Sequence, residues 1–204
     1  MAAITSTFTQ GNLTHVENPF SVALEGDGFF QIRTESGELQ YTRDGSFEIS
    51  PVANGNMLCT SDGNPVLDAY GNQIILPSNR VATDLVVNQD GTLAFPDGTG
   101  NPAVITDANG RPVKFGIYQF NNPAGLSKEG SNNYSVTVAS GAAVAENGNA
   151  AVKQTKTHQY YTEASNVDVA NEMVNLIVAQ RAYEMNSKAI QASDEMMQQA
   201  NALR

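Results

Sequence analysis

The chain contains 204 residues, of which 41% are hydrophobic, and its 11 basic and 21 acidic residues give a net charge of −10. This composition allows a sizeable core in one large or two small domains. The negative charge would repel the phosphates of nucleic acids and the anionic surface of a membrane, so we expect no nucleic-acid partner. No stretch approaches the roughly 18 apolar residues of a transmembrane helix, which argues against membrane insertion.

Cysteine usage and the first residues bear on redox chemistry and targeting. Cys59 is the only cysteine, which excludes an intrachain disulfide and a thiolate metal cluster, and we expect its side chain to be buried. The opening residues MAAITSTFTQGN carry neither a basic cluster nor an apolar run of signal-peptide length. We therefore expect any export to proceed without a cleaved signal peptide.

Short apolar or alternating runs, separated by turn dipeptides, fill the region from Val22 to about Phe120. The dipeptides are Asp27-Gly28, Asp44-Gly45, Asn54-Gly55, Asp62-Gly63, Asp90-Gly91 and Asn109-Gly110. Their glycines are expected to supply the positive φ angles that tight hairpin turns require. The apolar residues between the turns suit a half-buried sheet; they are Phe29, Phe30, Ile32, Tyr41, Phe47, Ile49, Val86, Val87, Leu93 and Phe95. The pattern predicts an antiparallel β domain, because the alternating helices that a parallel sheet needs are missing.

The same pattern continues more weakly toward the C-terminus. KFGIYQFNN and NNYSVTV, between Val113 and Val138, predict two more strands around the loop PAGLSKEGS. Residues 139–149 are rich in alanine, glycine and asparagine and predict an exposed loop, and AVKQTKTHQYYTEAS predicts a return strand. The expected organisation is an extended lead-in (1–24), an antiparallel β domain (25–138), a loop and return strand (139–164) and a helix (165–204).

The last forty residues, from Ser165 to Arg204, contain no glycine and no proline and predict one long α-helix. Ser165 or Asn166 is the expected N-cap, and Asp168 places a carboxylate in the first turn, where it is favoured by the helix dipole. A helix that continues to Leu203 would be roughly 55 Å long at about 1.5 Å per residue. The predicted fold class is therefore mainly β, with an antiparallel domain of tight hairpins and one long C-terminal α-helix.

Seven apolar residues recur at three- and four-residue steps along one face of this helix. They are Val169, Met173, Leu176, Ile177, Tyr183, Ile190 and Met197, and Gln180, Ser187 and Asp194 interrupt them in the same register. A helix of average length would bury such a stripe against its own sheet, but this helix is longer than a small β domain is wide. Burial of six or seven such side chains contributes at most about 10–20 kcal/mol. We therefore expect the stripe to be a coiled-coil assembly interface with another chain.

No residue pattern predicts catalysis, a cofactor or a metal. His15 and His158 lie far apart, each without a cysteine or second histidine at metal-ligand spacing, so ordinary surface or strand positions are favoured. Asp62, Asn64 and Asp68 suggest a calcium loop, but they fail its spacing and lack its final glutamate. Turn formation explains these three residues better.

Charged side chains allow two further functional interpretations, ligand binding by an arginine and hydrolysis by a pair of carboxylates. Arg43, in YTRDGSF, is expected to brace its own hairpin or a neighbouring carboxylate rather than bind a ligand. A carboxylate pair for glycoside hydrolysis stays open, because such pairs form in space and leave no spacing in the sequence.

Four segments resemble the bacterial flagellar rod and hook protein family. The stretch from Ser165 to Met196, SNVDVANEMVNLIVAQRAYEMNSKAIQASDEM, is similar to the closing helix of these proteins, most closely to that of the distal rod type. GDGFFQI (26–32) and YTRDGSFEI (41–49) resemble two further signatures, and TQGNL (9–13) resembles the lead into the β region. The resemblance includes Gly26, Gly28, Phe29, Phe30, Tyr41, Arg43, Asp44, Gly45, Phe47, Asn166, Gln180, Arg181 and Tyr183.

The resemblance implies a structural subunit that stacks helically into the hollow axial tube of the flagellar basal body and transmits torque. It implies a homo-oligomer, contacts with other rod and hook proteins, no enzymatic activity, and export beyond the cytoplasmic membrane by the flagellar type III apparatus. In such proteins the N- and C-terminal helices of each subunit pair in an inner coiled-coil layer, and the β domain forms the outer wall.

Two departures accompany the resemblance. Ser21 stands where the family usually has an aspartate, and the family's Asn-rich N-terminal helix has no counterpart, so we expect a truncated or divergent member. The alternative within the family is a proximal rod or hook subunit, although a hook subunit would usually carry a larger inserted β domain. The alternative from another class is a secreted β-rich binding module or glycan hydrolase, with the helix as a dimerisation arm.

Overall fold

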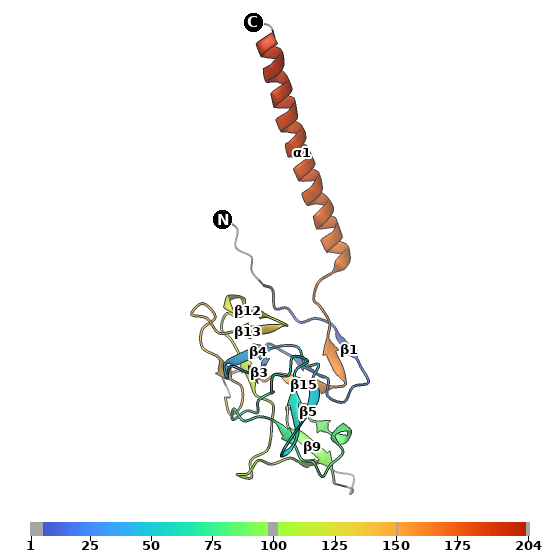
Figure 1. Ribbon diagram of the computed structural model, residues 1–204, viewed down its shortest axis with the longest axis vertical. Helices are drawn as coiled ribbons and strands as arrows, with labels where there is room; N and C mark the ends of the chain where they lie inside the picture. Colours follow the sequence, from blue (N-terminus) through green and yellow to red (C-terminus); the bar gives the residue numbers. More distant parts are fainter. Residues whose placement is uncertain (1–5, 98–101, 150, 203–204) are drawn as a thin grey trace. The chain divides into compact units, whose positions relative to one another are not determined.

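The computed structural model describes residues 6–97, 102–149 and 151–202. It divides into two compact units, Met1–Ser165 and Asn166–Arg204. All sixteen strands of the described residues belong to the first unit, and the second contains the α-helix α1 (Val169–Ala202) (Figure 1). Every strand pairing is antiparallel, so the predicted fold class, mainly antiparallel β with one long C-terminal helix, is confirmed.

The largest sheet has six strands in the order β12-β13-β4-β3-β11-β14. These are β3 (Phe29–Arg33), β4 (Leu39–Thr42), β11 (Ile117–Gln119), β12 (Ser127–Gly130), β13 (Asn133–Ser135) and β14 (Val144–Ala145). In Figure 1, β12, β13, β4 and β3 follow one another across this sheet. Phe30 on β3 pairs with Thr42 on one side and with Ile117 on the other, which places the GDGFFQI segment in the middle of the sheet.

Smaller sheets complete the unit. One contains β5 (Glu48–Val52), β6 (Gly55–Cys59) and β7 (Ile75–Leu76), and another contains β8 (Val86–Val87), β9 (Leu93–Pro96) and β10 (Pro102–Val104). Two ribbons pair β2 (Val22–Glu25) with β15 (Lys156–Gln159) and β1 (Leu13–His15) with β16 (Tyr161–Glu163). The short 3-10 helices are η1 (Ala82–Asp84) and η2 (Pro123–Gly125). The two ribbons return the C-terminal strands to the start of the chain.

One loop type occurs five times in the described part of this unit. Each copy is five residues long, with a bond from the first N–H to the fifth carbonyl and one from the fourth N–H to the first carbonyl. The copies are Thr34–Glu38, Thr60–Asn64, Asp68–Asn72, Asn88–Thr92 and Asp107–Arg111. Glycine occupies the fourth position with φ between +75° and +87°, where other residues are strained. The turn prediction is confirmed here for Gly63, Gly91 and Gly110.

Phe29 and Phe30 belong to two different cores, because successive side chains of a strand point to opposite faces. Phe30 packs in the larger core, where its ring lies 5.0 Å from that of Phe47 and 5.2 Å from that of Phe115. Phe29 packs in a smaller aromatic core, 5.5 Å from the ring of Phe120. Both phenylalanines are fully buried. Phe29 and Phe30 thus place one aromatic ring in each core, on opposite faces of β3.

Several local predictions were wrong. The expected loop PAGLSKEGS contains β12, and the expected exposed loop 139–149 contains β14 and the buried side chains of Ser140 and Glu146. The expected return strand is present, but it is divided into β15 and β16 at Tyr160, whose φ is +65°. Strands far away in sequence order β14, β15 and β16 through hydrogen bonds, whereas β12 forms a short hairpin with the neighbouring β13.

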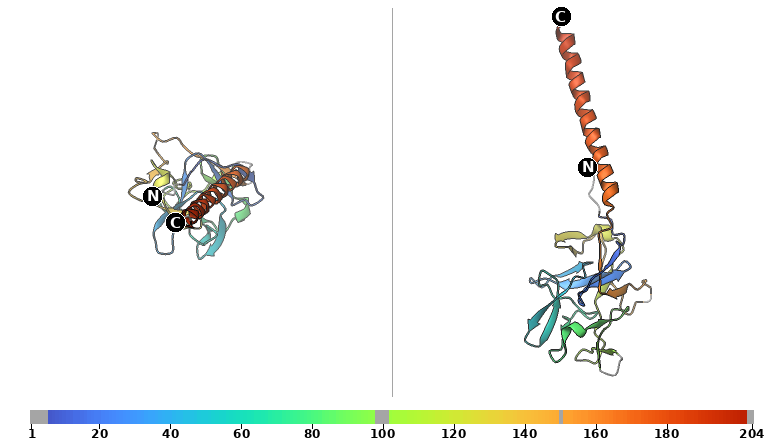
Figure 2. Two further views of the ribbon diagram at one scale, coloured as in Figure 1. Left: turned by 90° about the horizontal axis from the view of Figure 1, so that it is seen from above. Right: turned by 90° about the vertical axis from the view of Figure 1, so that its right-hand side faces the viewer.

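The helix α1 begins at Val169, so the prediction that Ser165 or Asn166 is the N-cap was wrong. The Asp168 carboxylate accepts a hydrogen bond from the backbone N–H of Ala170 at 2.9 Å, the geometry of an N-cap. At 34 residues the helix is about 51 Å long. It is continuous in Figure 2, consistent with a sequence that lacks glycine and proline, and its predicted end at Leu203 lies outside the described residues. Among these described residues, no helix combines the length and apolar character that crossing a bilayer requires.

Candidate functional site

The predicted assembly stripe is exposed along α1. Its seven residues, Val169, Met173, Leu176, Ile177, Tyr183, Ile190 and Met197, range from 48% exposed at Ile177 to 78% at Tyr183. Apolar side chains of this size are available for contact with another chain, and burial there would be favourable. Their role as an interface remains a prediction.

A second apolar line runs along the same helix. It consists of Val174, Val178, Met185 and Met196, all more than half exposed. At about 100° per residue these positions fall on the side opposite Val169. This line was not predicted from the sequence, although its steps of four, seven and eleven residues are close to one, two and three helical turns. A helix with two apolar faces can be covered by two neighbours at once.

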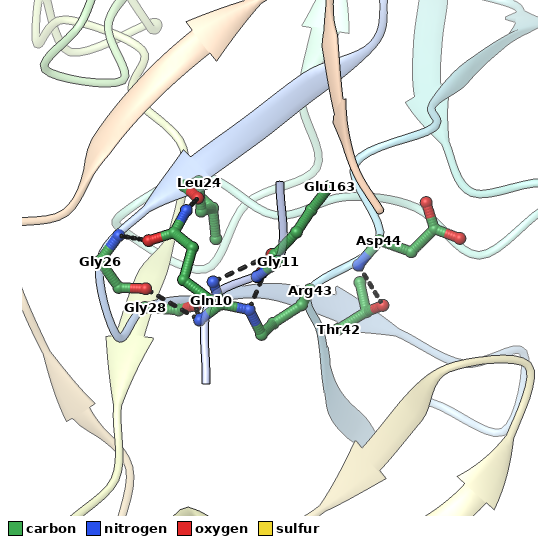
Figure 3. A network of polar contacts seen from close by, with 9 residues as sticks. All are labelled: Gln10, Gly11, Leu24, Gly26, Gly28, Thr42, Arg43, Asp44 and Glu163. Carbon is green, nitrogen blue, oxygen red and sulfur yellow. Dashed lines mark hydrogen bonds and ion pairs between the residues drawn. The ribbon is translucent and has the colours of Figure 1, made fainter. Parts of the chain in front are cut away.

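Arg43 connects the two signature segments of the β unit (Figure 3). Its Nη1 donates to the carbonyls of Gly26, at 2.9 Å, and Gly28, at 3.3 Å. Its Nε donates to Glu163 Oε2 at 3.0 Å, and its Nη2 lies 2.9 Å from the same oxygen as an ion pair without hydrogen-bond alignment. The guanidinium carbon lies 5.7 Å from the ring centre of Phe29. The expectation that Arg43 braces a neighbouring carboxylate is confirmed.

The lead-in segment is tied to the same site. The Gln10 side chain donates to the carbonyl of Leu24 at 2.6 Å and accepts from the N–H of Gly26 at 3.0 Å. The N–H of Gly11 donates to Glu163 Oε1 at 2.9 Å, so both oxygens of this carboxylate have partners. We call Gln10, Gly11, Gly26, Arg43 and Glu163 the Arg43 clasp. It brings together residues near both ends of the β unit with the GDGFF segment.

Two signature glycines, Gly28 and Gly45, do not have positive φ, so the prediction that they form tight turns was wrong. Both lie in close contact with neighbouring segments. A Cβ at Gly28 would stand 2.5 Å from the Ile117 side chain and 2.9 Å from Glu146 Oε1. A Cβ at Gly45 would stand 1.8 Å from the Val22 carbonyl oxygen. At these two positions the hydrogen side chain allows neighbouring segments to approach.

The buried carboxylate next to Gly28 belongs to Glu146, which the sequence analysis missed. Its oxygens accept from the N–H of Thr155 at 2.7 Å, the Thr155 hydroxyl at 2.6 Å and the Gln119 amide at 2.8 Å. A charged group can be buried when several donors satisfy it in this way. Glu146 therefore ties the segment 139–149 to β11 and to the residues before β15.

The remaining candidates have local structural roles. Asp68 is buried and accepts from the N–H groups of Tyr70 and Asn72, both at 2.8 Å, within one of the five-residue loops, which is the predicted turn role. His158 Nε2 lies 2.7 Å from Glu25 Oε2, and this contact lowers the pKa of the Glu25 carboxyl. His15 lies on β1, and its ring centre is 5.3 Å from that of Tyr161.

Cys59 is buried, as predicted, and burial raises the pKa of its thiol, which disfavours the reactive thiolate. Within the described ranges no cluster of three or more histidine, cysteine, aspartate or glutamate side chains could hold a metal ion.

Comparison with known proteins adds two family matches. Residues 23–95 match the flagellar hook protein FlgE/F/G D1 domain, and residues 158–203 match the C-terminal domain of the flagellar basal body rod FlgEFG proteins. The first match includes both signature segments around Arg43, and the second includes Glu163 and the helix. The Arg43–Glu163 pair therefore joins the two matched regions.

Curated relatives cover nearly the whole chain. The flagellar basal-body rod protein FlgG of Borreliella burgdorferi is 38% identical over 208 residues, which cover 100% of this chain and 72% of that protein. FlgG of Buchnera aphidicola subsp. Acyrthosiphon pisum is 37% identical, over 96% of this chain and 69% of that protein. The flagellar hook-basal body complex protein FlhP of Bacillus subtilis is 34% identical over the same shares. The chain therefore belongs to the flagellar basal-body rod protein family, and within it to the distal rod type.

Proposed function

We propose that the chain is a structural subunit of the distal rod of the bacterial flagellum, which polymerises into a hollow axial tube and transmits torque. The observation that supports this most directly is the helix α1, whose two apolar lines are exposed in a member of the rod protein family. A polymer that does not close on itself needs two different complementary surfaces on each subunit. The two lines of α1 supply two such surfaces on one element.

The path of the chain near β1 and β16 suggests what covers the first line. Leu13 pairs with Glu163 in the antiparallel ribbon, so the segment before Gln10 and the segment after Glu163 leave the ribbon at the same end. We propose that the predicted stripe meets a helix contributed from the N-terminal side of a subunit. The second line then contacts a neighbouring copy. This arrangement is the inner coiled-coil layer that the family resemblance implies.

The two units then have separate roles. The helical segment 165–204 serves coiled-coil assembly, and the β unit, with the predicted domain 25–138 as its centre, forms the outer wall of the tube. Segment 139–164, whose described residues form β14, β15 and β16, connects the two regions along the chain. The described part of the lead-in, residues 6–24, is held against the β unit by Gln10 and by the strand pairings of β1 and β2.

Family membership implies a flagellar location and assembly with other rod and hook proteins. We propose further that the subunit acts without catalysis or a cofactor. We also propose that the flagellar type III apparatus exports it beyond the cytoplasmic membrane without cleavage of a signal peptide. A pulse-chase comparison of its mass before and after export tests the last point, since cleavage would shorten the exported form.

The test of assembly uses aspartate substitutions on the two helix lines. In flagellated cells, Ile177→Asp on the first line and Val178→Asp on the second are each expected to abolish rod completion and swimming, because a carboxylate would be buried at an apolar contact. Asn175→Asp, which lies between the two lines, is the matched control and should swim normally. Electron microscopy of basal bodies and immunoblots for protein level give the readout. Normal rods in both variants would contradict the proposed function.

A further inference from the structure

We propose that the Arg43 clasp, through its central pair Arg43–Glu163, anchors the strand leading into α1 and thereby couples the helix to the β unit. This inference deepens the proposed function and rests on it, because coupling matters only in a subunit that carries load between its parts. The pair spans 120 residues of sequence and joins a signature loop to the last strand.

The strand that the clasp holds has little support of its own. β16 is three residues long, and its strand partner among the described residues is the equally short β1, in a two-stranded ribbon. Isolated two-stranded ribbons are marginally stable in water, so attachment to the rest of the unit is needed. After Glu163, the N–H of Ala164 donates to the carbonyl of Asn12 at 2.9 Å, and the helix cap follows at Asp168. Tension that α1 transmits along the chain reaches β16 before any other strand, because β16 directly precedes α1 in the element order.

The clasp resists such tension because its contacts point in different directions. Glu163 is held by Arg43 through Oε2 and by Gly11 through Oε1, and Arg43 is held in turn by the carbonyls of Gly26 and Gly28. Both charged side chains are well shielded, at 14% and 12% exposed. Charge-assisted hydrogen bonds are stronger when shielded from water in this way.

An arginine suits this position better than a lysine. The planar guanidinium reaches one carboxylate and two carbonyls at once through separate nitrogens, whereas an ammonium is a single point charge. Glu163 is equally specific, because both of its oxygens act as acceptors. A glutamine at position 163 has only one acceptor oxygen. Its amide N–H₂ would therefore meet the N–H donor of either Arg43 or Gly11, and two donors cannot form a hydrogen bond with each other.

The experiment compares Glu163→Gln with Asp107→Asn in the full chain. The control breaks a second arginine–carboxylate pair of the β unit, between Arg111 and Asp107, whose nitrogen and oxygen atoms lie 2.7 Å apart. Hydrogen exchange of residues 9–16 and 160–165 is expected to accelerate at least about tenfold in Glu163→Gln, and not in Asp107→Asn. The larger core around Phe30 should keep its protection in both variants.

The positioning role also predicts an effect in cells. Glu163→Gln is expected to reduce swimming and the yield of complete rods, while Asp107→Asn leaves both unchanged. Arg43→Gln combined with Glu163→Gln should be no worse than Arg43→Gln alone, because the ion pair is already lost in Arg43→Gln and the glutamine oxygen at position 163 can still accept from the N–H of Gly11. Unchanged exchange at residues 160–165, or equal swimming defects in Glu163→Gln and Asp107→Asn, would overturn the clasp. Failure of the proposed function is distinguishable, because it would appear as normal rods in Ile177→Asp and Val178→Asp.

Discussion

Gly45 lies directly against the backbone of Val22. Its carbonyl accepts the N–H of Val22 at 3.0 Å, and a Cβ on Gly45 would stand 1.8 Å from the Val22 carbonyl oxygen. The YTRDGSF loop is thereby pressed onto the start of β2. Ser21, beside Val22, forms a bridge with Ser46, so this contact includes the position where the family usually has an aspartate. The close approach explains why glycine stands at the centre of this signature.

We predict that Gly45→Ala destabilises the chain by about 3 kcal/mol or more, because the atom in the way is backbone and cannot rotate aside. Urea unfolding, followed by tyrosine fluorescence, measures the loss. Gly63→Ala is the control: its site is open, but its φ is +84°, so a loss of only about 1–2 kcal/mol is expected. Equal losses in the two variants would contradict the close-contact explanation.

Tyr160 is strained where the chain passes from β15 to β16. Its φ is +65°, while its N–H donates to the Ser21 carbonyl at 2.9 Å and its carbonyl accepts from Val16 at 2.8 Å. Two hydrogen bonds therefore hold a bulky residue in the left-handed region, at a cost on the order of 1–3 kcal/mol.

Substitutions at Tyr160 should separate strain from ring contacts. Tyr160→Gly relieves the strain, whereas Tyr160→Val retains it, and both remove the ring that stacks on His15. We expect the glycine variant to be more stable than the valine variant by about 1–2 kcal/mol. Thermal unfolding by circular dichroism gives the comparison. A valine variant as stable as the glycine variant would mean that position 160 relaxes out of the left-handed region.

Local sequence signals predicted the fold class and the long helix well. Glycine-centred turns and alternating apolar runs act over a few residues, so GDGFFQI, YTRDGSFEI and the later hairpins were recognisable as strands. The absence of glycine and proline after Ser165 was an equally local signal for α1. The pairing of Arg43 with a carboxylate was expected in kind, but its partner was not identifiable from sequence.

The remainder depended on contacts between distant residues. Glu146 lies in an alanine- and glycine-rich segment without local preference, and it is buried because Thr155 and Gln119 supply donors from elsewhere. Gly28 and Gly45 resemble turn glycines in sequence, and only the folded structure shows that other segments of the chain pack directly against them. The second apolar line of α1 is an exception, because the seven-residue spacing of Val178 and Met185 is a local signal that the sequence already contains.

The cap of α1 gives a further prediction. Asp168 Oδ1 accepts from the N–H of Ala170 at 2.9 Å, and Oδ2 accepts from the Asn171 side chain at 2.8 Å. Asp168→Ala should therefore cost about 1 kcal/mol of helix stability and fray the first turn. Hydrogen exchange of residues 169–173 measures this effect. Asp168→Asn keeps an acceptor oxygen and should behave like the native chain; fraying of equal size in both variants would argue against the cap.

Asp107 should contribute to stability in a pH-dependent way. The backbone N–H of Arg111 donates to its carboxylate, and with the Arg111 side chain and the N–H of Asn109 it lowers the pKa of Asp107. Because this pKa is lower in the folded than in the unfolded chain, the contribution is complete above the unfolded value of about 3.9 and is lost as the pH falls through the folded value.

Asp107→Asn tests this dependence without removing the loop, since asparagine also accepts the two backbone N–H groups. Urea unfolding at a series of pH values below about 4 should show a smaller acid-induced loss of stability in the variant than in the native chain. A titration of the Asp107 carboxyl carbon by NMR gives its pKa directly. Equal acid sensitivity of the two proteins, or a midpoint at the ordinary aspartate value, would show that the Arg111 donors do not favour the charged form.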